Sequence, residues 1–395
     1  MVPTNCFQIS NKKYNLFKGI IQHDKIYQIL LFYFISLFSY IFYFNGYLLS
    51  YNFPFLFSLV IITGDSLIKP DKKLQSFSYP FFLDLSIYLA LPVLFVLIFF
   101  VVSIFSNSLP AWYISGFKDF FNIDFIHLQQ SFNAFDKISI IMATFLIGGS
   151  MSIAGGHELA HRKKNKFDLL VGNWLLAFSF DCNFAIEHVY GHHKNVCLNE
   201  DPASAKRGEN IYIFILKGII NEHLSGWEIE LKRLKRKKIG FFTIENKILK
   251  GYFRSVLISF LSFWLFGLIG MLTFFLIAFL SKASLETINY VEHYGLVRER
   301  GKPVRMRHSW NSNHFFSSIY LYNVTRHSDH HRNPNLKFWE LSPVDKDAPM
   351  LPYGYLTMLY LAAFTPYLYK KIMKKELDNW DQNFANEFER KLVKS

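Results

Sequence analysis

Residues 255–281 read SVLISFLSFWLFGLIGMLTFFLIAFLS and carry no charged side chain. A helix needs about 20 mostly apolar residues to cross the hydrocarbon layer of a membrane. This run is therefore long enough for one tilted helix or for a tight pair of helices. The sequence predicts an integral membrane protein built from α-helices.

Other apolar runs support the same fold class. Three of them lack charged residues, and two weaker ones contain a single aspartate, Asp65 or Asp181. The first run is too long for the apolar part of a cleaved signal peptide, and no small-residue cleavage site follows it. We expect one membrane domain over residues 1–395, with a cap at 286–369 and a polar tail at 370–395. The expected spans, about six in all, are 26–50, 53–68, 85–108, 138–156, 169–184 and 255–281.

The net charge of +13 is unevenly distributed along the chain. Cytoplasmic loops of membrane proteins are enriched in Lys and Arg. Basic clusters flank most of the apolar runs, whereas the segment 106–137 has mixed charge. This pattern places 106–137 outside and both termini in the cytoplasm. It also disfavours nucleic-acid binding, since the basic residues do not line one polar domain.

Nine of the 14 histidines fall in four short motifs: HELAH at 157–161, EHVYGHH at 187–193, NYVEHYG at 289–295 and HSDHH at 327–331. A histidine on an apolar helix is usually a packed core residue, but clusters of this density beside membrane spans indicate metal binding. The nine candidate ligands are His157, His161, His188, His192, His193, His293, His327, His330 and His331.

Spacing within the motifs supports this interpretation. Residues three or four apart share one face of a helix. His157 with His161, or His188 with His192, can therefore present two imidazoles to one ion, and so can His327 with either His330 or His331. One ion takes at most six ligands, so nine histidines favour two ions.

The ligand type limits which metals can bind. Imidazole suits Zn, Cu, Fe and Ni. Cys6, Cys182 and Cys197 are too widely spaced for a zinc-ribbon or rubredoxin-type site.

Two functions from other classes remain open at this point. HELAH fits the H-E-x-x-H signature of zinc proteases. Such an enzyme needs only one or two further ligands, which leaves most of the other histidines unexplained. A membrane protein that stores metal without catalysis is the second alternative.

The four motifs resemble those of a known family. The three boxes at 157–161, 188–193 and 327–331 are similar to those of the membrane desaturase–hydroxylase superfamily. NYVEHYGL at 289–296 and HSWNSNH at 308–314 resemble the alkane 1-monooxygenase family, as do RHSDHH, LPYGY and GDSLIKPD in their order and spacing. The resemblance covers residues from about 53 to 369. The stretches that flank HSDHH depart from the family pattern, which leaves the preferred substrate length open.

The resemblance implies six transmembrane helices around an apolar channel, in the inner membrane of a bacterium, with the site on the cytoplasmic side. It implies that the nine histidines hold two non-haem iron ions and that O2 is the co-substrate, with neither haem nor flavin. The expected reaction converts the terminal C–H bond of an n-alkane to a 1-alkanol. Electrons would come from a separate rubredoxin, reduced by an NAD(P)H-dependent reductase. Within the superfamily, methyl-group hydroxylation of xylene-type substrates and fatty-acyl desaturation or hydroxylation are the alternatives.

Polar residues near the boxes are candidates to hydrogen-bond the ligands, because metal-bound imidazoles donate their second N–H to a carboxylate or carbonyl. The alternative for each is a solvated or structural side chain. The candidates beside the ligands are Glu158, Glu187, Asn289, Glu292, Asn313, His314 and Asp329.

The basic stretch LKRLKRKK at 231–238 has three interpretations. It is ordinary cytoplasmic charge, a contact for anionic lipid, or a docking site for an acidic electron carrier. The sequence identifies no substrate-contacting residue.

Overall fold

The computed structural model describes residues 49–74 and 76–394. Within these ranges all regular elements are helices, apart from one isolated bridge between Asn311 and Met350. The predicted span at 26–50 lies almost entirely outside the described residues. The elements of the first half are α3 (Leu49–Leu67), α4 (Phe81–Phe105), α5 (Ala111–Phe121), α6 (Phe125–Ser131), α7 (Ala134–Gly149), η1 (Ser150–Ala154), α8 (Gly155–His161), α9 (Lys166–Ala177), α10 (Phe184–Glu187), η2 (His188–His192) and α11 (His193–Asn195).

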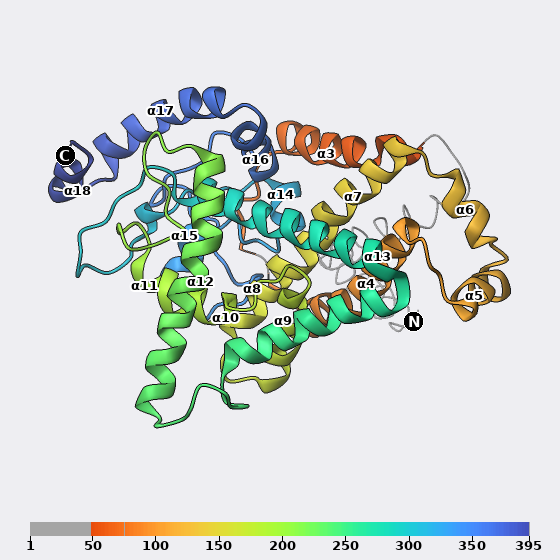
Figure 1. Cartoon of the computed structure of the whole chain (residues 1–395). Coiled ribbons are helices and arrows are strands. Elements are labelled where there is room, and N and C mark those ends of the chain that lie inside the picture. Colours follow the sequence, from red (N-terminus) through yellow and green to blue (C-terminus); the bar gives the residue numbers. More distant parts are fainter. Residues whose placement is uncertain (1–48, 75, 395) are drawn as a thin grey trace, which may run out of the picture.

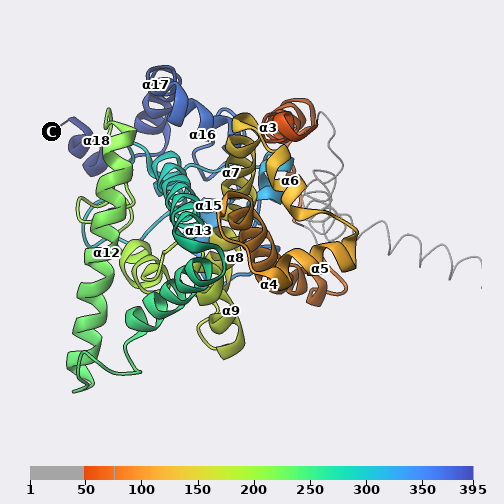
Figure 2. The same ribbon diagram turned by 45° about the vertical axis from the view of Figure 1, so that its right-hand side comes forward.

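The second half contains the longest helices and the C-terminal elements. Its elements are α12 (Ile211–Arg236), α13 (Lys247–His293), η3 (Met306–His308), α14 (Phe315–Tyr320), α15 (His327–Arg332), α16 (Tyr355–Phe364), α17 (Pro366–Asn383) and α18 (Glu387–Lys394). In Figures 1 and 2, α5 and α6 lie at one end of the molecule and α12 lies at the other. The histidine-bearing helices α8 and α15 lie between these ends, as does α10, which leads directly into the histidine-bearing η2.

Three helical stretches of the described chain are long and apolar enough to cross a membrane: Phe81–Phe105, Ala134–His161 and Lys247–His293. They contain most of the predicted spans at 85–108, 138–156 and 255–281. Their outer faces are exposed and apolar, as Val96 and Trp264 show with exposed fractions of 64% and 68%. Such surfaces are normal against lipid, where exposed apolar side chains carry no hydration cost.

The run at 255–281 folds as a pair of helices. Gly267 interrupts α13 with φ 69° and ψ −172°, a backbone conformation that is open almost only to glycine. Figure 1 shows the two arms of α13 as a V. Arms of about 20 and 26 residues would be about 30 and 39 Å long, enough for each to cross a hydrocarbon layer.

Two weaker predicted spans have different outcomes. The region 53–68 lies in α3 (Leu49–Leu67), a helix of 19 residues with Pro54 inside it. The first part of the region 169–184 is helical and forms the C-terminal part of α9. The helix ends at Ala177, and the chain turns after it, where Phe180 adopts a positive φ of 55°. At about 1.5 Å per residue, the 12 residues of α9 are too short to cross a membrane.

Asparagine side chains begin several of these helices. Asn133, Asn165, Asn210 and Asn246 each accept hydrogen bonds from two backbone N–H groups in the first turn of α7, α9, α12 and α13. These N–H groups have no partner within the helix, so such a cap contributes about 1 kcal/mol. The caps fix where α12 and α13 start after polar loops.

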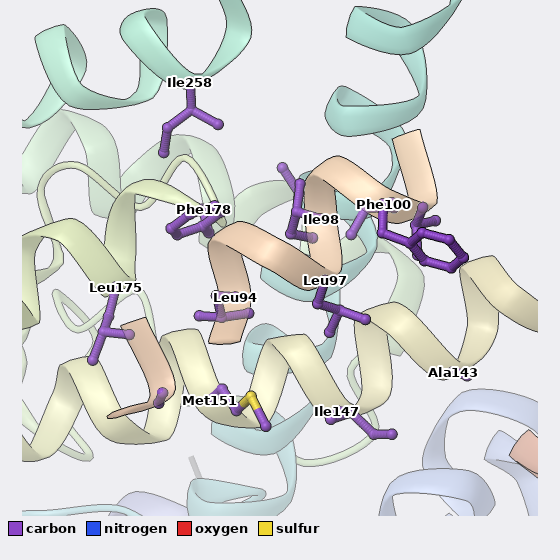
Figure 3. Packing of buried hydrophobic residues seen from close by; sticks show 14 of the residues in the cluster. Leu94, Leu97, Ile98, Phe100, Ala143, Ile147, Met151, Leu175, Phe178 and Ile258 are labelled. Atoms are coloured by element: carbon purple, nitrogen blue, oxygen red, sulfur yellow. The ribbon is translucent and has the colours of Figure 1, made fainter. Parts of the chain in front are cut away.

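The apolar core forms where α4, α7, α9 and both arms of α13 meet. Figure 3 shows Leu94, Leu97, Ile147, Leu175 and other side chains from these helices packed against one another. The packing places η1 and α8, which continue directly from α7, in the middle of the bundle. The second arm of α13 lies against α7, where Ser281 is close to Gly149, and against α12, where Lys282 pairs with Glu222. The core therefore holds the helix ends that carry the first and third histidine motifs.

Candidate metal centre

The four motifs occupy helix ends in the middle of the molecule. HELAH forms most of α8, and the second motif runs through α10, η2 and α11. His293 is the last residue of α13, and HSDHH forms α15. Eight of the nine histidines are buried, and His193 is partly buried. Helices from distant parts of the sequence thus bring all nine together.

The nine histidines form two groups. In each group the candidate ligand atoms lie within 4.8 Å of one another. The five-histidine group contains one residue pair from α8, one pair from the second motif and one residue of α15. The four-histidine group takes one residue each from η2 and α13 and two from α15. The groups are His157, His161, His188, His193 and His330, and His192, His293, His327 and His331.

The π-helix η2 decides how the second motif is divided. We expected His188 and His192 to share an ion, because they are four residues apart. The backbone N–H of His193 instead bonds to the carbonyl oxygen of His188, the five-residue step of a π-turn. The Nε2 atoms of His188 and His193 are therefore 3.1 Å apart, and His192 joins the other group.

A glycine allows this turn to form. A Cβ atom on Gly191 would lie 2.5 Å from Glu187 Oε1 and 3.2 Å from Ile229 Cδ1 of α12. The first of these separations is shorter than non-bonded atoms tolerate. Glycine in the YGHH sequence therefore lets η2 pack closely against α12.

The Nε2 atoms converge at distances that fit metal ions. A tetrahedral site with bonds of about 2.1 Å separates its nitrogens by about 3.4 Å, whereas ligands at right angles around a five- or six-coordinate ion lie about 3.0 Å apart. The observed spacings agree better with the second arrangement. They are 3.1 Å for His157–His330, His188–His193 and His193–His330, 3.2 Å for His192–His331 and His293–His327, and 2.9 Å for His327–His331.

Burial keeps most of these rings neutral, which is the form that binds metal. It lowers the pKa of His188 and His193 in the five-histidine group, with neighbouring histidines adding to the effect. It does the same for His327 and His331 in the other group. Within the described residues, Nε2 of His161 has no hydrogen-bond partner despite its burial. An unpartnered buried nitrogen beside four converging ones fits a site for a metal cation.

Hydrogen bonds from Nδ1 of His192 and His293 determine which ring nitrogen of each faces the other ligands of the four-histidine group. Nδ1 of His192 lies 3.0 Å from Asp201 Oδ2, and Nδ1 of His293 donates to the carbonyl oxygen of His308 at 3.1 Å. Because Nδ1 carries the hydrogen in both rings, their Nε2 lone pairs point into the four-histidine group. Burial opposes protonation of His192, but Asp201 raises its pKa.

The sequence did not predict that Asp201 or His308 contacts a ligand. Asp201 lies nine residues after His192 in the loop NEDP, and only the tertiary fold shows that it faces the ring. Its position soon after the second box, in a loop rich in polar residues, was the available signal. His308 begins HSWNSNH, one of the stretches that resemble the alkane 1-monooxygenase family, but it lies outside the four histidine motifs and no contact with a ligand was predicted for it.

The polar residues that we expected beside the ligands have varied contacts. Glu292 Oε2 lies 3.2 Å from Nε2 of His327. Glu158 instead pairs with Arg162 at 2.7 Å, and Asp329 accepts the backbone N–H of Ser342.

The remaining expected residues also bond elsewhere. Glu187 accepts from Ser225, and burial together with nearby carboxylates raises its pKa to about 8. Asn289 donates to Glu222 and Glu286, while His314 bonds to Ser312. The Asn313 side chain is buried without a hydrogen-bond partner in the part of the chain that is described.

An apolar cavity leads to both groups. Its wall includes His157 and His188 of the five-histidine group and His327 of the four-histidine group. The rest of the lining is mostly apolar and comes largely from α7, η1, α13 and α16, with Phe145, Ile153 and Leu359 among its residues. Its polar residues are four Ser or Thr side chains together with Asn289 and Glu292.

This arrangement of histidine segments on membrane helices has a counterpart among known families. A family model described as fatty acid desaturase matches residues 138–362, more than half of the chain. The chain belongs to the fatty acid desaturase family. The region matched by the desaturase model runs from α7 to α16 and includes all nine histidines.

Individual relatives of this desaturase-family chain are hydroxylases. It is 35% identical over 249 residues to alkane 1-monooxygenase 1 of Pseudomonas aeruginosa, a match that covers 62% of this chain and 64% of the relative. It is 33% identical over 258 residues to alkane 1-monooxygenase 2 of Alcanivorax borkumensis, covering 64% and 67%. The first match thus spans a little less than two thirds of that relative's length. The xylene/toluene monooxygenase hydroxylase component of Pseudomonas putida is 28% identical, with 89% of each chain covered.

Proposed function

We propose that this protein is an alkane 1-monooxygenase, which inserts one atom of O2 into the terminal C–H bond of medium- or long-chain n-alkanes. The observation that carries the proposal is the apolar cavity whose wall includes histidines of both groups. A hydrocarbon fits such a cavity because it offers apolar contacts and no hydrogen bonds. The similarity to two alkane 1-monooxygenases supports the same substrate class.

We propose that the nine histidines hold two non-haem iron ions, one in each group. A zinc protease needs three or four protein ligands around one ion, so nine histidines in two groups disfavour the zinc-protease alternative. The irons, when bound, supply the oxidising power that no amino-acid side chain has. The balanced reaction takes an alkane, O2, two electrons and two protons to a 1-alkanol and water.

The protein's own groups prepare the site. Asp201 and the carbonyl of His308 direct two Nε2 lone pairs inward, and burial keeps the other rings neutral. The apolar wall binds the alkane chain and excludes water, so the reacting carbon is held beside the metals. Glu292 reaches both the cavity and His327, so its carboxyl group can accept or give a proton there.

We propose a six-span topology in a bacterial inner membrane, with the site and both termini in the cytoplasm. In the described part, α3, α4, α7–α8 and the two arms of α13 would supply five spans; the sixth would be the apolar run at 26–50, which lies almost entirely outside the described residues. In this topology the second arm of α13 is a span in place of the predicted span at 169–184, because α9 is too short to cross the membrane. Lipid would contact the exposed apolar faces of these helices, while the basic loops remain in the cytoplasm.

We propose that a rubredoxin, reduced by an NAD(P)H-dependent reductase, delivers the electrons. The basic end of α12 supports this partner. Lys194, Lys232, Lys235 and Arg236 line one surface hollow, and α12 packs against η2 through Ile229 and Gly191. An acidic carrier bound there would lie beside the helix that carries His188 and His192. Complementary charge raises the rate of such encounters.

The test is a whole-cell assay with 18O2. Cells that produce this chain with a rubredoxin and its reductase would receive octane and hexadecane. We expect 18O-labelled 1-alkanol from the native chain and none from His327→Ala. If the native chain, loaded with iron and supplied with reduced rubredoxin, gives no alcohol from either alkane, the proposal is wrong.

Hydroxylation of methyl groups on aromatic rings is the second candidate. It is supported by the xylene/toluene monooxygenase component, whose similarity extends over 89% of both chains. Toluene and xylene in the same assay would distinguish the two. Labelled benzyl alcohols without labelled 1-alkanols would favour the second function, and an alkene without labelled alcohol would favour desaturation.

A further inference from the structure

The last helix, α18, carries a buried carboxylate with four hydrogen-bond donors. Oε1 of Glu389 accepts from His308 Nε2 at 2.8 Å and from Arg307 Nη2 at 3.0 Å. Oε2 accepts from Arg307 Nε at 2.8 Å and from the backbone N–H of Asn386 at 2.9 Å. The Glu389 side chain is only 1% exposed. A polar tail residue is therefore held against the segment that contains His308.

The contacts around His308 define its protonation. The backbone N–H of Arg305 donates to His308 Nδ1 at 3.0 Å, so Nδ1 must be an acceptor. The neutral ring then carries its hydrogen on Nε2 and donates it to Glu389. Burial lowers the pKa of His308, which agrees with the neutral form. Both ring nitrogens are thus engaged, and the ring cannot rotate without loss of a hydrogen bond.

The backbone of the same residue contacts the metal centre. The His308 carbonyl oxygen accepts from His293 Nδ1 at 3.1 Å and from Cys197 Sγ at 3.0 Å. His293 belongs to the four-histidine group. A ring anchored at both nitrogens holds its own carbonyl in place, and that carbonyl sets the orientation of the His293 imidazole.

We propose that Glu389 is a positioning residue for the four-histidine metal group, acting through His308 on the ring of His293. The inference rests on the two-metal site proposed above and extends it to the C-terminal helix. Glu389 does not touch the metal site itself, so its effect must pass through the short helix η3. The consequence is selective, since the five-histidine group has no such link to α18 among the described contacts.

A purely structural role for Glu389 predicts a different result. Trp380 Nε1 also donates to the carbonyl oxygen of Arg307 at 2.7 Å, so α17 anchors the same segment. If Glu389 only attached α18 to the surface, its loss would lower stability without a selective effect on one metal ion. Metal release distinguishes the two roles.

The experiment uses the purified full chain loaded with ferrous iron in detergent. Iron release to a chelator is followed over time for the native chain and for Glu389→Ala, Glu389→Gln and Glu387→Ala. Glu387 is the matched control, an exposed glutamate on the same helix. His192→Ala, which removes a donor from the four-histidine group, assigns the release phase of that group.

We expect Glu389→Ala to release the ion of the four-histidine group about tenfold faster and the other ion at the native rate. Glu389→Gln keeps an oxygen acceptor and should fall between Glu389→Ala and the native chain, whereas Glu387→Ala should match the native chain. Unchanged release from both groups in Glu389→Ala, or equal acceleration from both, would overturn the inference. A native chain with fewer than two irons would instead contradict the two-iron proposal.

Discussion

At the scale of single residues, a substitution of Asp201 tests whether the hydrogen bond from a ligand's second ring nitrogen controls metal affinity. Asp201→Asn removes the charge that faces His192 Nδ1 at 3.0 Å while it preserves the shape of the side chain. We expect metal affinity of the four-histidine group to fall about 10–100-fold, because the amide is a weaker acceptor for the imidazole N–H. Iron per chain and chelator competition would measure this.

Glu200→Gln is the control for that change. Glu200 is the neighbouring residue, is exposed and pairs with Arg300 on the surface. Its substitution should leave iron content at the native value. Native affinity in Asp201→Asn would mean that the carboxylate does not orient the ring.

The carboxylate of Glu389 makes the free energy of unfolding depend on pH. Burial opposes its ionisation, but hydrogen bonds from His308 and Arg307 lower its pKa from 4.5 to about 2. A pKa that is lower in the folded state contributes stability above pH 4.5, and that contribution is lost as the pH falls towards 2. We therefore expect the melting temperature of Glu389→Gln to lie below that of the native chain at pH 6, with the difference shrinking between pH 5 and pH 3.

Glu387→Gln provides the reference for this titration, because its exposed side chain should give a small difference at every pH. Thermal scans in detergent at fixed salt would measure both. A constant difference between Glu389→Gln and the native chain would contradict the expected pKa shift.

At the scale of secondary-structure elements, a buried ion cluster joins three parts of the helical bundle. Lys282 Nζ on α13 lies 2.6 Å from Glu222 of α12, 2.8 Å from Glu286 of α13 and 3.0 Å from Asp181 between α9 and α10. Lys282→Met would leave three buried carboxylates without their cation. Breaking a buried pair in this way costs about 3–5 kcal/mol, so the melting temperature should fall clearly.

Lys250→Met is the matched control on the same helix, since Lys250 is exposed. Its melting temperature should equal that of the native chain. Addition of Glu222→Gln and Glu286→Gln to Lys282→Met should restore part of the loss by removing the uncompensated charge. Equal melting temperatures for Lys282→Met and the native chain would show that the cluster does not join these helices.

The same cluster explains one limit of the sequence-based prediction. The apolar run ended at residue 281 because Lys282 carries a charge, yet α13 continues to His293. The carboxylates that compensate Lys282 come from other elements and cannot be recognised locally. The reversal at Gly267 and the end of α9 at Ala177 likewise depend on packing. Three predicted spans therefore coincide with long apolar helices, whereas the short α9 and the division of α13 into two arms could not be predicted from the apolar runs.

At the scale of the whole molecule, local and tertiary information contributed differently to the candidate site. The nine histidines could be selected from the sequence, because their spacing within each motif is a local property. Their division into groups of five and four could not, because it depends on the π-turn in η2. The contacts of Asp201 and Glu389 were missed because they depend on tertiary structure: Asp201 turns back to His192 nine residues earlier, and Glu389 contacts His308 from 81 residues further along the chain.

The cavity links this architecture to substrate length. Ala363 and Phe364 of α16 belong to its lining, and Phe364 is 68% exposed, which places the mouth beside the end of α16. A long alkane with its terminal carbon at the histidines must extend towards this mouth.

Ala363→Trp would narrow the mouth of the cavity, so hexadecane hydroxylation should fall several-fold more than octane hydroxylation. The measurement is 1-alkanol yield from each alkane in cells with equal amounts of enzyme. Leu368→Trp, an exposed position on α17 outside the lining, should leave the ratio of the two products unchanged. An equal loss for both alkanes would mean that the chain does not pass the end of α16.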